Sequence, residues 1–146
     1  MRQSDEMAIT TYLNIVSAEN EIFSGIVEQL VASGELGELG IIPGHAPLLT
    51  ILKPGEVMIT LPGGKQKIYY ISGGMLEVQP YNVTILADSV VRAENLDEAA
   101  ALAAKARAEE AIANKNADMD HSIATAELAM AMAQIRVIQK LRKTIK

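Results

Sequence analysis

Few side chains in this sequence are suited to catalysis, and those few lie far apart. The chain has two histidines and no cysteine, so it offers neither a thiolate nucleophile nor a thiolate metal ligand. Neither His45 nor His121 has Cys, His, Asp or Glu residues around it at metal-ligand spacing. A structural or contact role is favoured for His45, and exposure in a first helical turn for His121. The sequence therefore predicts no catalytic residue, no metal site and no cofactor.

Two glycine-rich segments and two acidic pairs resemble catalytic motifs only superficially. No GxxxxGK[ST] phosphate-binding loop occurs. Pro62-Gly63-Gly64 and Ser72-Gly73-Gly74 stand between strand-like segments, which is typical of turns. The pairs Asp97-Glu98 and Glu109-Glu110 are adjacent on predicted helices, where neighbouring side chains diverge. Solvated surface is the simplest interpretation of both pairs.

Positive charge is concentrated at the end of the chain, although the formal net charge of the protein is −5. Residues 128–146 contain five basic side chains and no acidic one. Basic residues near the end of a helix interact favourably with its dipole, which gives a purely structural explanation. The functional alternative is a clamp for an acidic surface on a partner. The five residues are Arg136, Lys140, Arg142, Lys143 and Lys146.

The overall composition describes an ordinary globular chain. Its 146 residues allow one domain or two small ones, and its core must be aliphatic because there is one Phe and no Trp. No apolar run approaches the roughly 18 residues of a spanning helix, and the first residues, MRQSDEM, do not resemble a signal peptide. The acidic net charge argues against nucleic-acid binding. We expect a soluble protein facing the cytosol, with residues 1–6 frayed and Met7 as the start of the fold or an alternative initiator.

The segment 34–49 has the most distinctive sequence, GELGELGIIPGHAPLL. Its glycines permit backbone conformations that other residues avoid, while Pro43 and Pro47 remove two donors from any sheet ladder. We predict a shaped loop that holds Glu35, Glu38 and His45 at the surface. A tight connection at a sheet edge and a partner-binding loop both fit these features. The aliphatic side chains expected to be buried are Leu36, Leu39, Ile41, Ile42, Leu48 and Leu49.

Short strand-like segments separated by turns fill most of the first 90 residues. Between residues 10 and 18, Tyr12, Asn14 and Val16 alternate with Leu13, Ile15 and Ser17, which predicts a strand. Such repeated short strands are typical of an antiparallel β-sandwich, and a flattened barrel gives the same pattern. Further strands are predicted at residues 26–32, 48–52, 56–61, 65–72, 75–79 and 82–87, with turns at 19–21, 53–55, 62–64 and 80–82.

From Leu96 onward the sequence is dominated by alanine, the strongest helix former. We predict a helix over residues 97–113, begun by Asn95 and Glu98 as a capping pair. Lys115-Asn116 should break it. A second helix, capped by Asp118 or Asp120, should then run to about Lys143.

The short connection predicts an antiparallel helical hairpin. The fold class is therefore α+β, with a β-sandwich domain at residues 1–93 and a two-helix domain at residues 94–146. The second helix has a wider apolar surface than its alanine-rich neighbour can cover. Either the sandwich covers the remainder, or docking on the sandwich alternates with docking on a partner. The apolar residues are Ile123, Leu128, Met130, Met132, Ile135, Val137, Ile138, Leu141 and Ile145.

Three segments resemble the epsilon subunit of the bacterial F-type ATP synthase. They are GELGELGIIPGHAPLL, LKPGEV at residues 52–57 and ISGGMLEVQPYNVTILAD at residues 71–88, and the resemblance extends from about Met7 to the C-terminus. It implies a non-catalytic rotor subunit of the central stalk that binds the gamma subunit and the c-subunit ring, coupling proton translocation to ATP synthesis. It implies a place at the cytoplasmic face of the bacterial plasma membrane, as a peripheral protein held only through the complex.

The resemblance also implies roles for individual residues of the sandwich. Glu38 matches the loop acid that faces the c ring, and Leu39 and Gly40 lie beside it in the same motif. The positions expected to face gamma are Ser17, His45, Ala46 and Pro47.

For the C-terminal hairpin, the resemblance implies that it can leave the sandwich, insert into the catalytic head of alpha and beta subunits and inhibit ATP hydrolysis. The matching basic residues, expected to meet an acidic segment of beta, are Arg136, Lys140, Arg142 and Lys143.

Some members of this family bind ATP through a motif (I/L)DxxRA at the start of the first helix. Here Leu96 and Asp97 match, but Ala100 occupies the arginine position. Arg107, Arg136 and Arg142 are the other candidate cations, and losing a charge-assisted donor weakens recognition of phosphate or base. We therefore predict weak or absent ATP binding, with Asp97 as the only retained nucleotide-binding candidate.

Two other function classes compete with a rotor subunit. A sandwich module that binds a small ligand or carbohydrate through residues 34–49 would need exposed aromatic platforms, and the chain has only four Tyr and one Phe. A small hydrolase would need a nucleophile and a base within reach of each other, and the sequence supplies no such pair.

Overall fold

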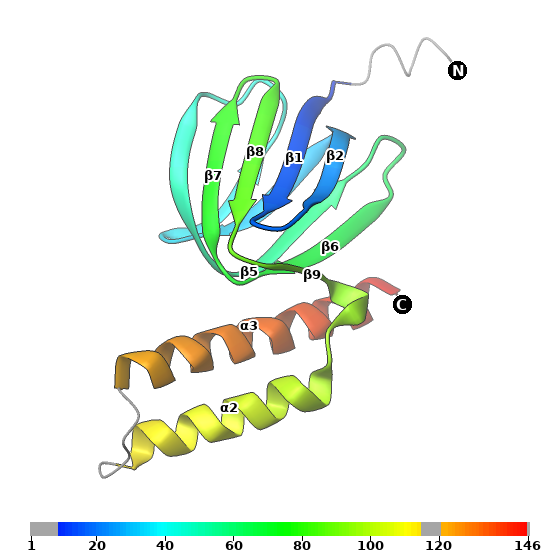
Figure 1. Cartoon of the computed structure of the whole chain (residues 1–146). Helices are drawn as coiled ribbons and strands as arrows, with labels where there is room; N and C mark the ends of the chain where they lie inside the picture. The colour runs from blue at the N-terminus through cyan, green and yellow to red at the C-terminus, as the bar shows by residue number, and fades with distance from the viewer. Residues whose placement is uncertain (1–8, 115–120, 146) are drawn as a thin grey trace.

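The computed structural model describes residues 9–114 and 121–145, which form nine strands, one short 3-10 helix and two α-helices (Figure 1). The predicted α+β fold class is confirmed, since a β-sandwich precedes two helices. The strands are β1 (Thr11–Ser17), β2 (Glu21–Val27), β3 (Gln29–Gly34), β4 (Gly37–Ile41), β5 (Leu48–Thr60), β6 (Gln66–Ile71), β7 (Gly74–Gln79), β8 (Asn82–Ala87) and β9 (Val90–Arg92). The helices are η1 (Ala93–Asn95), α2 (Glu98–Ala113) and α3 (His121–Ile145).

Strand β5 belongs to both layers of the sandwich. Its residues 48–52 pair with β7, and its residues 55–60 pair with β6 and β3. One layer therefore runs β2-β1-β8-β7-β5, and the other contains β4, β3, the second part of β5, β6 and β9. The turn predicted at residues 53–55 is wrong, because the strand continues through Pro54. Pro54 lacks an N–H, and it lies where β5 passes from one layer to the other, without a ladder partner there.

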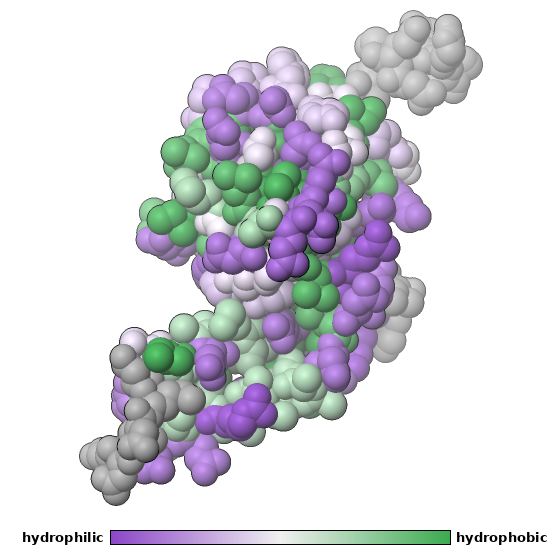
Figure 2. All heavy atoms as spheres, viewed as in Figure 1, coloured by the Kyte–Doolittle hydropathy of each residue, from purple (hydrophilic) through white to green (hydrophobic). Residues whose placement is uncertain are grey.

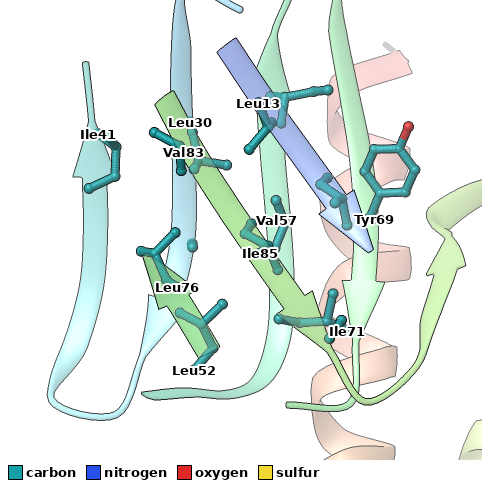
Figure 3. Close-up of a cluster of buried hydrophobic side chains, with 14 of the residues drawn as sticks. Leu13, Leu30, Ile41, Leu52, Val57, Tyr69, Ile71, Leu76, Val83 and Ile85 are labelled. Carbon is teal, nitrogen blue, oxygen red and sulfur yellow. The ribbon is translucent and has the colours of Figure 1, made fainter. Parts of the chain in front are cut away.

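The main core lies between the two layers (Figure 3). Leu13 and Ile15 of β1 are fully buried, while Tyr12 is exposed, so the alternation predicted for residues 10–18 is confirmed. Leu30 and Val57 enter the same core from the opposite layer. Burial of such aliphatic side chains is the main stabilising contribution to the sandwich.

Two predictions about the strands need correction. The strand expected at residues 26–32 is divided at Glu28, since Val27 pairs with Thr11 of one layer and Gln29 with Thr60 of the other. The sandwich is also not wholly antiparallel, because β1 and β8 pair in parallel. A parallel pair needs a long connection, and nearly the whole sandwich lies between these strands in sequence.

The segment 34–49 is more regular and less buried than predicted. It contains β4, which forms a hairpin with β3, and it ends in the first residues of β5. Leu39, Ile41 and Leu48 pack in or against the core as expected. The burial predicted for the others is wrong, since Leu36, Ile42 and Leu49 are exposed.

The helices begin differently from the prediction. The expected capping pair of Asn95 and Glu98 is wrong, since Asn95 ends η1 and the N-cap of α2 is Asp97. An Asp97 carboxylate oxygen accepts a hydrogen bond from the Ala100 N–H at 3.1 Å, which satisfies one of the free donors of the first turn. Helix α3 ends at Ile145, slightly beyond the predicted Lys143. Four other predictions concern residues outside the described ranges. They are the fraying of residues 1–6, the start of the fold or an alternative initiator at Met7, the helix break at Lys115-Asn116 and the helix cap at Asp118 or Asp120.

Helix α3 lies between α2 and the sandwich (Figure 1). It packs on the outer face of β5 and β6 through what we call the docking cluster, with Met58, Val91, Leu96 and Leu141 packed around it. Part of the wide apolar surface of α3 is therefore covered by the sandwich, whereas Ile123 and Met132 stay exposed. Within the described residues, no helix is both long and apolar enough to cross a membrane. The docking cluster consists of Ile68, Tyr70, Ala93, Ala133 and Val137.

Candidate interaction surfaces

Among the residues that the structure describes, the two histidines and the acidic side chains do not assemble into a catalytic centre. His45 is half-buried, and its Nδ1 lies 2.7 Å from the carbonyl oxygen of Ala46 in its own loop. His121 is exposed at the start of α3. Among residues 9–114 and 121–145, no group of three or more His, Cys, Asp or Glu side chains could hold a metal ion. The candidate sites considered below are surfaces.

An apolar row crosses the outer face of the first layer, on the side of the sandwich opposite α3. Val16 pairs with Leu86, Leu86 with Met75, and Met75 with Ile51, so the four side chains stand side by side across β1, β8, β7 and β5. The exposed fractions of Leu86, Met75 and Ile51 are 55%, 41% and 54%. Figure 2 shows apolar atoms gathered over β7 and β8 on this face. A contiguous exposed apolar patch of this kind marks an interaction surface.

The residues predicted to face gamma lie at opposite ends of this face. Ser17 ends β1, beside a shallow groove that is lined in part by Val16, Met75 and Leu86. The loop that carries His45, Ala46 and Pro47 lies at the other end, where the Gly44 N–H donates to the Pro80 carbonyl at 2.6 Å. The structure does not bring the predicted set together, but it places the apolar row between its two parts.

The sequence contained a signal for this row that the prediction missed. At Ile51-Leu52, Met75-Leu76 and Ile85-Leu86, the inward and outward positions are both apolar. Strands that are apolar on both faces are typical of sheets covered on both sides. Since one face of this layer packs on the core, the other is available for a partner.

The residues predicted to face the c ring lie on β4, in the β3–β4 hairpin. Glu38 is exposed and pairs with Ser33 of β3, while Gly40 is exposed and pairs with Val31. Leu39 is half-buried and packs against the main core, so it anchors the hairpin. Leu36 is completely exposed at the hairpin tip. The hairpin therefore presents Glu38 on the edge strand β4, with an apolar residue at its tip.

The basic residues of α3 are partly engaged by carboxylates of the chain itself. Lys140 Nζ lies 3.1 Å from Glu56 Oε1 of β5, which joins α3 to the sandwich. Arg142 donates two hydrogen bonds to Glu98 of α2, at 3.1 and 2.5 Å. The hydrogen bond and the charge of Glu98 both raise the pKa of Arg142 above its ordinary value. Arg136 and Lys143 are exposed beside a groove that also contains Gln139 and Glu56.

The candidate nucleotide-binding residue has a structural role in α2. The Asp97 side chain caps the helix through the N–H of Ala100, the position at which the family motif has arginine. Arg107 and Arg136 are exposed, while Arg142 is paired with Glu98. The Asp97 carboxylate thus already accepts a backbone hydrogen bond, and residue 100, the arginine position of the motif, carries no positive charge.

Comparison with known proteins finds a family match for each of the two parts of the chain. Residues 10–93 match the family described as "ATP synthase, Delta/Epsilon chain, beta-sandwich domain", and residues 94–139 match "ATP synthase, Delta/Epsilon chain, long alpha-helix domain". The chain is 72% identical over 140 residues to an "ATP synthase epsilon chain" of Legionella pneumophila (strain Corby), covering 96% of this chain and 100% of that protein. It is 55% identical over 139 residues to the "ATP synthase epsilon chain" of Nitrosococcus oceani, with 95% and 99% coverage.

Solved structures of more distant proteins share the fold. A chain of the Euglena gracilis mitochondrial ATP synthase aligns with a TM-score of 0.71 at 21% identity, covering 94% of this chain and 82% of that one. A chain in the central stalk and c-ring structure of the Tetrahymena thermophila mitochondrial ATP synthase aligns with a TM-score of 0.61 at 13% identity, covering 88% and 96%. At these identities the likeness concerns the arrangement of sandwich and helices.

Proposed function

Because the chain belongs to the epsilon-chain family of F-type ATP synthases, and is thus a non-catalytic subunit of that complex, we propose that it acts as a rotor part of the central stalk. In this role it couples proton translocation to ATP synthesis, bound to the gamma subunit and the c-subunit ring. It is held peripherally at the cytoplasmic face of the bacterial plasma membrane through these partners. No observation favours the small-ligand module or the hydrolase considered from the sequence.

The apolar row carries the proposal for gamma. It forms an exposed band on the face of the sandwich that α3 leaves free, and its position between Ser17 and the His45 loop supports one continuous contact surface. Interfaces typically have an apolar centre within a polar rim. We assign the row as the centre of the gamma contact, with Ser17, His45, Ala46 and Pro47 at its margins.

The β3–β4 hairpin supports the proposed contact with the c ring. Glu38 is exposed on a strand that Leu39 anchors to the core, so the backbone that carries its carboxylate is fixed while the side chain is free to meet a polar partner. Leu36 at the tip adds exposed apolar area beside it.

The helical hairpin supports the proposed regulatory role. It joins the sandwich through the small docking cluster, whereas the sandwich has its own larger core. A part held by few buried contacts can open without unfolding the rest. We propose that the released hairpin enters the catalytic head of alpha and beta subunits and inhibits ATP hydrolysis through Arg136, Lys140, Arg142 and Lys143.

Two matched substitutions test the gamma contact. Met75 in the apolar row and Met132 on α3 are 41% and 40% exposed, so Met75→Glu and Met132→Glu place the same charge at equally exposed sites. Calorimetric titration of the full chain with recombinant gamma should show stoichiometric binding, weakened about tenfold or more by Met75→Glu because a charge is desolvated at the interface centre. Met132→Glu should bind like the parent. Equal binding by all three proteins would exclude the row as the gamma surface.

A further inference from the structure

We propose that Glu56 is a latch residue of the sandwich: it holds Lys140 of α3, and so sets how often the helical hairpin leaves. This inference rests on the proposed release of the hairpin. It goes further by naming an internal acid that competes with an external acidic partner for one of the basic residues of α3.

The geometry makes this ion pair part of the docked interface. The paired atoms, Lys140 Nζ and Glu56 Oε1, are 3.1 Å apart in residues separated by 84 positions in the chain. The Glu56 side chain is only 17% exposed, and that of Lys140 is 37% exposed. Among the ion pairs described for the chain, Lys140–Glu56 links hairpin to sandwich, while Arg142–Glu98 links the two helices to each other. When the hairpin leaves as a unit, the first pair must break and the second can persist.

The two partners of the latch are not equivalent. The second carboxylate oxygen of Glu56, Oε2, is buried and accepts no hydrogen bond within the described part of the chain. Lys140 therefore offsets most of the desolvation cost of the Glu56 carboxylate, which lies beneath α3. A buried charge without its partner is costly, whereas Lys140 can extend its ammonium group into water. Removing the lysine should thus destabilise docking more than neutralising the glutamate.

The absence of cysteine from the sequence allows a direct measurement of release. Ala133 is fully buried in the docking cluster, so Ala133→Cys provides a single thiol that is shielded while α3 is docked. With a thiol reagent that reacts slowly compared with reclosing, opening is a pre-equilibrium and the labelling rate reports the open fraction. The full chain carrying this substitution serves as the parent for all variants.

Lys140→Gln should raise the labelling rate about tenfold, because it strands the Glu56 carboxylate at a partly exposed site. Glu56→Gln should raise it only about threefold. Adding Glu56→Gln to Lys140→Gln should slow labelling relative to Lys140→Gln alone, since the stranded charge is then gone. Arg107→Gln on α2 removes an exposed positive charge from the hairpin away from the sandwich and should label like the parent.

Slower labelling of the double variant than of Lys140→Gln distinguishes an ion-pair latch from packing of the Lys140 side chain. If Lys140 acted only through its aliphatic stem, Glu56→Gln would not slow labelling of the Lys140→Gln variant, and this result would overturn the proposal. Labelling of Lys140→Gln within about twofold of the parent would also overturn it, since leaving a mostly buried charge without its partner costs more than that. The assay contains no other subunit, so either failure leaves the gamma contact, measured separately by titration, unaffected.

Discussion

Trimming the face that receives α3 should shift the hairpin toward release without changing the helices themselves. Ile68 of β6 is only 6% exposed and belongs to the docking cluster. Its side chain points toward α3 and away from the main core, so substitution there alters the receiving surface. If the released hairpin inhibits hydrolysis as proposed, a change in inhibition then comes from its population and not from its own contacts with the catalytic head.

The magnitude follows from the apolar carbon that becomes exposed on release. Ile68→Ala removes three carbon groups at about 0.8 kcal/mol each, so docking should weaken by about 2.4 kcal/mol, or roughly 60-fold in the open fraction. Ile68→Val removes one such group and should give about fourfold. The reduced strand propensity of alanine affects docked and released states alike, because β6 stays in the sandwich in both.

Two assays measure the consequence. Thiol labelling at position 133 in the Ala133→Cys background should accelerate in the order parent, Ile68→Val, Ile68→Ala. In the reconstituted enzyme, the same order should give progressively lower ATP hydrolysis, because more hairpin is available to the head. Ile51→Ala, on the opposite face at 54% exposure, is the control for labelling. Faster labelling with unchanged hydrolysis would refute the link between hairpin release and inhibition, and unchanged labelling would refute the role of the docking cluster.

Four other perturbations test separate parts of the scheme. Ending the chain after Asn95 should leave a folded sandwich that binds gamma and should raise ATP hydrolysis by the assembled enzyme; unchanged hydrolysis would place inhibition elsewhere. Glu38→Lys should weaken c-ring binding more than gamma binding, whereas equal loss would indicate a misfolded hairpin. Burial raises the pKa of Tyr70 above its ordinary value near 10. The contribution of the Tyr70 hydroxyl to docking should therefore be constant below about pH 10 and be lost as the pH rises through the docked pKa, so the labelling rate of the Ala133→Cys thiol should rise less over this range in Tyr70→Phe than in the parent. Calorimetry with ATP should show weak or no binding, because Ala100 replaces the motif arginine, and saturable micromolar binding would contradict this.

The elements that depend on local sequence were predictable. The alternation around Leu13 and Ile15 identified β1, and the turns at Pro62-Gly63-Gly64 and Pro80-Tyr81 identified two hairpins. Each signal lies within a few residues, so it does not depend on how distant strands pair. The alanine-rich composition likewise indicated α2, although the cap moved from Asn95 to Asp97 because residues 93–95 form η1.

Features that depend on distant partners were not predictable in the same way. Lys53-Pro54-Gly55 has the composition of a turn, yet β5 runs through it because pairing with β7 on one side and β6 on the other holds the strand extended. The Lys140–Glu56 pair joins positions 84 residues apart, so no local pattern marks it. The basic residues of α3 were recognised as a group, but their internal carboxylate partners became visible only with the packing of α3 on β5 and on α2.

The positions of the two apolar surfaces are compatible with the proposal that one small subunit is anchored and regulated at once. The apolar row lies on the outer face of one layer, and the docking cluster lies on the outer face of the other, with the main core between them. The two sets share no residue, so substitutions in one should combine additively with substitutions in the other. If gamma binds over the row as proposed, it need not be displaced when α3 leaves the docking cluster. In the scheme we propose, the sandwich stays attached to the stalk while the hairpin exchanges Glu56 for an acidic partner on the catalytic head.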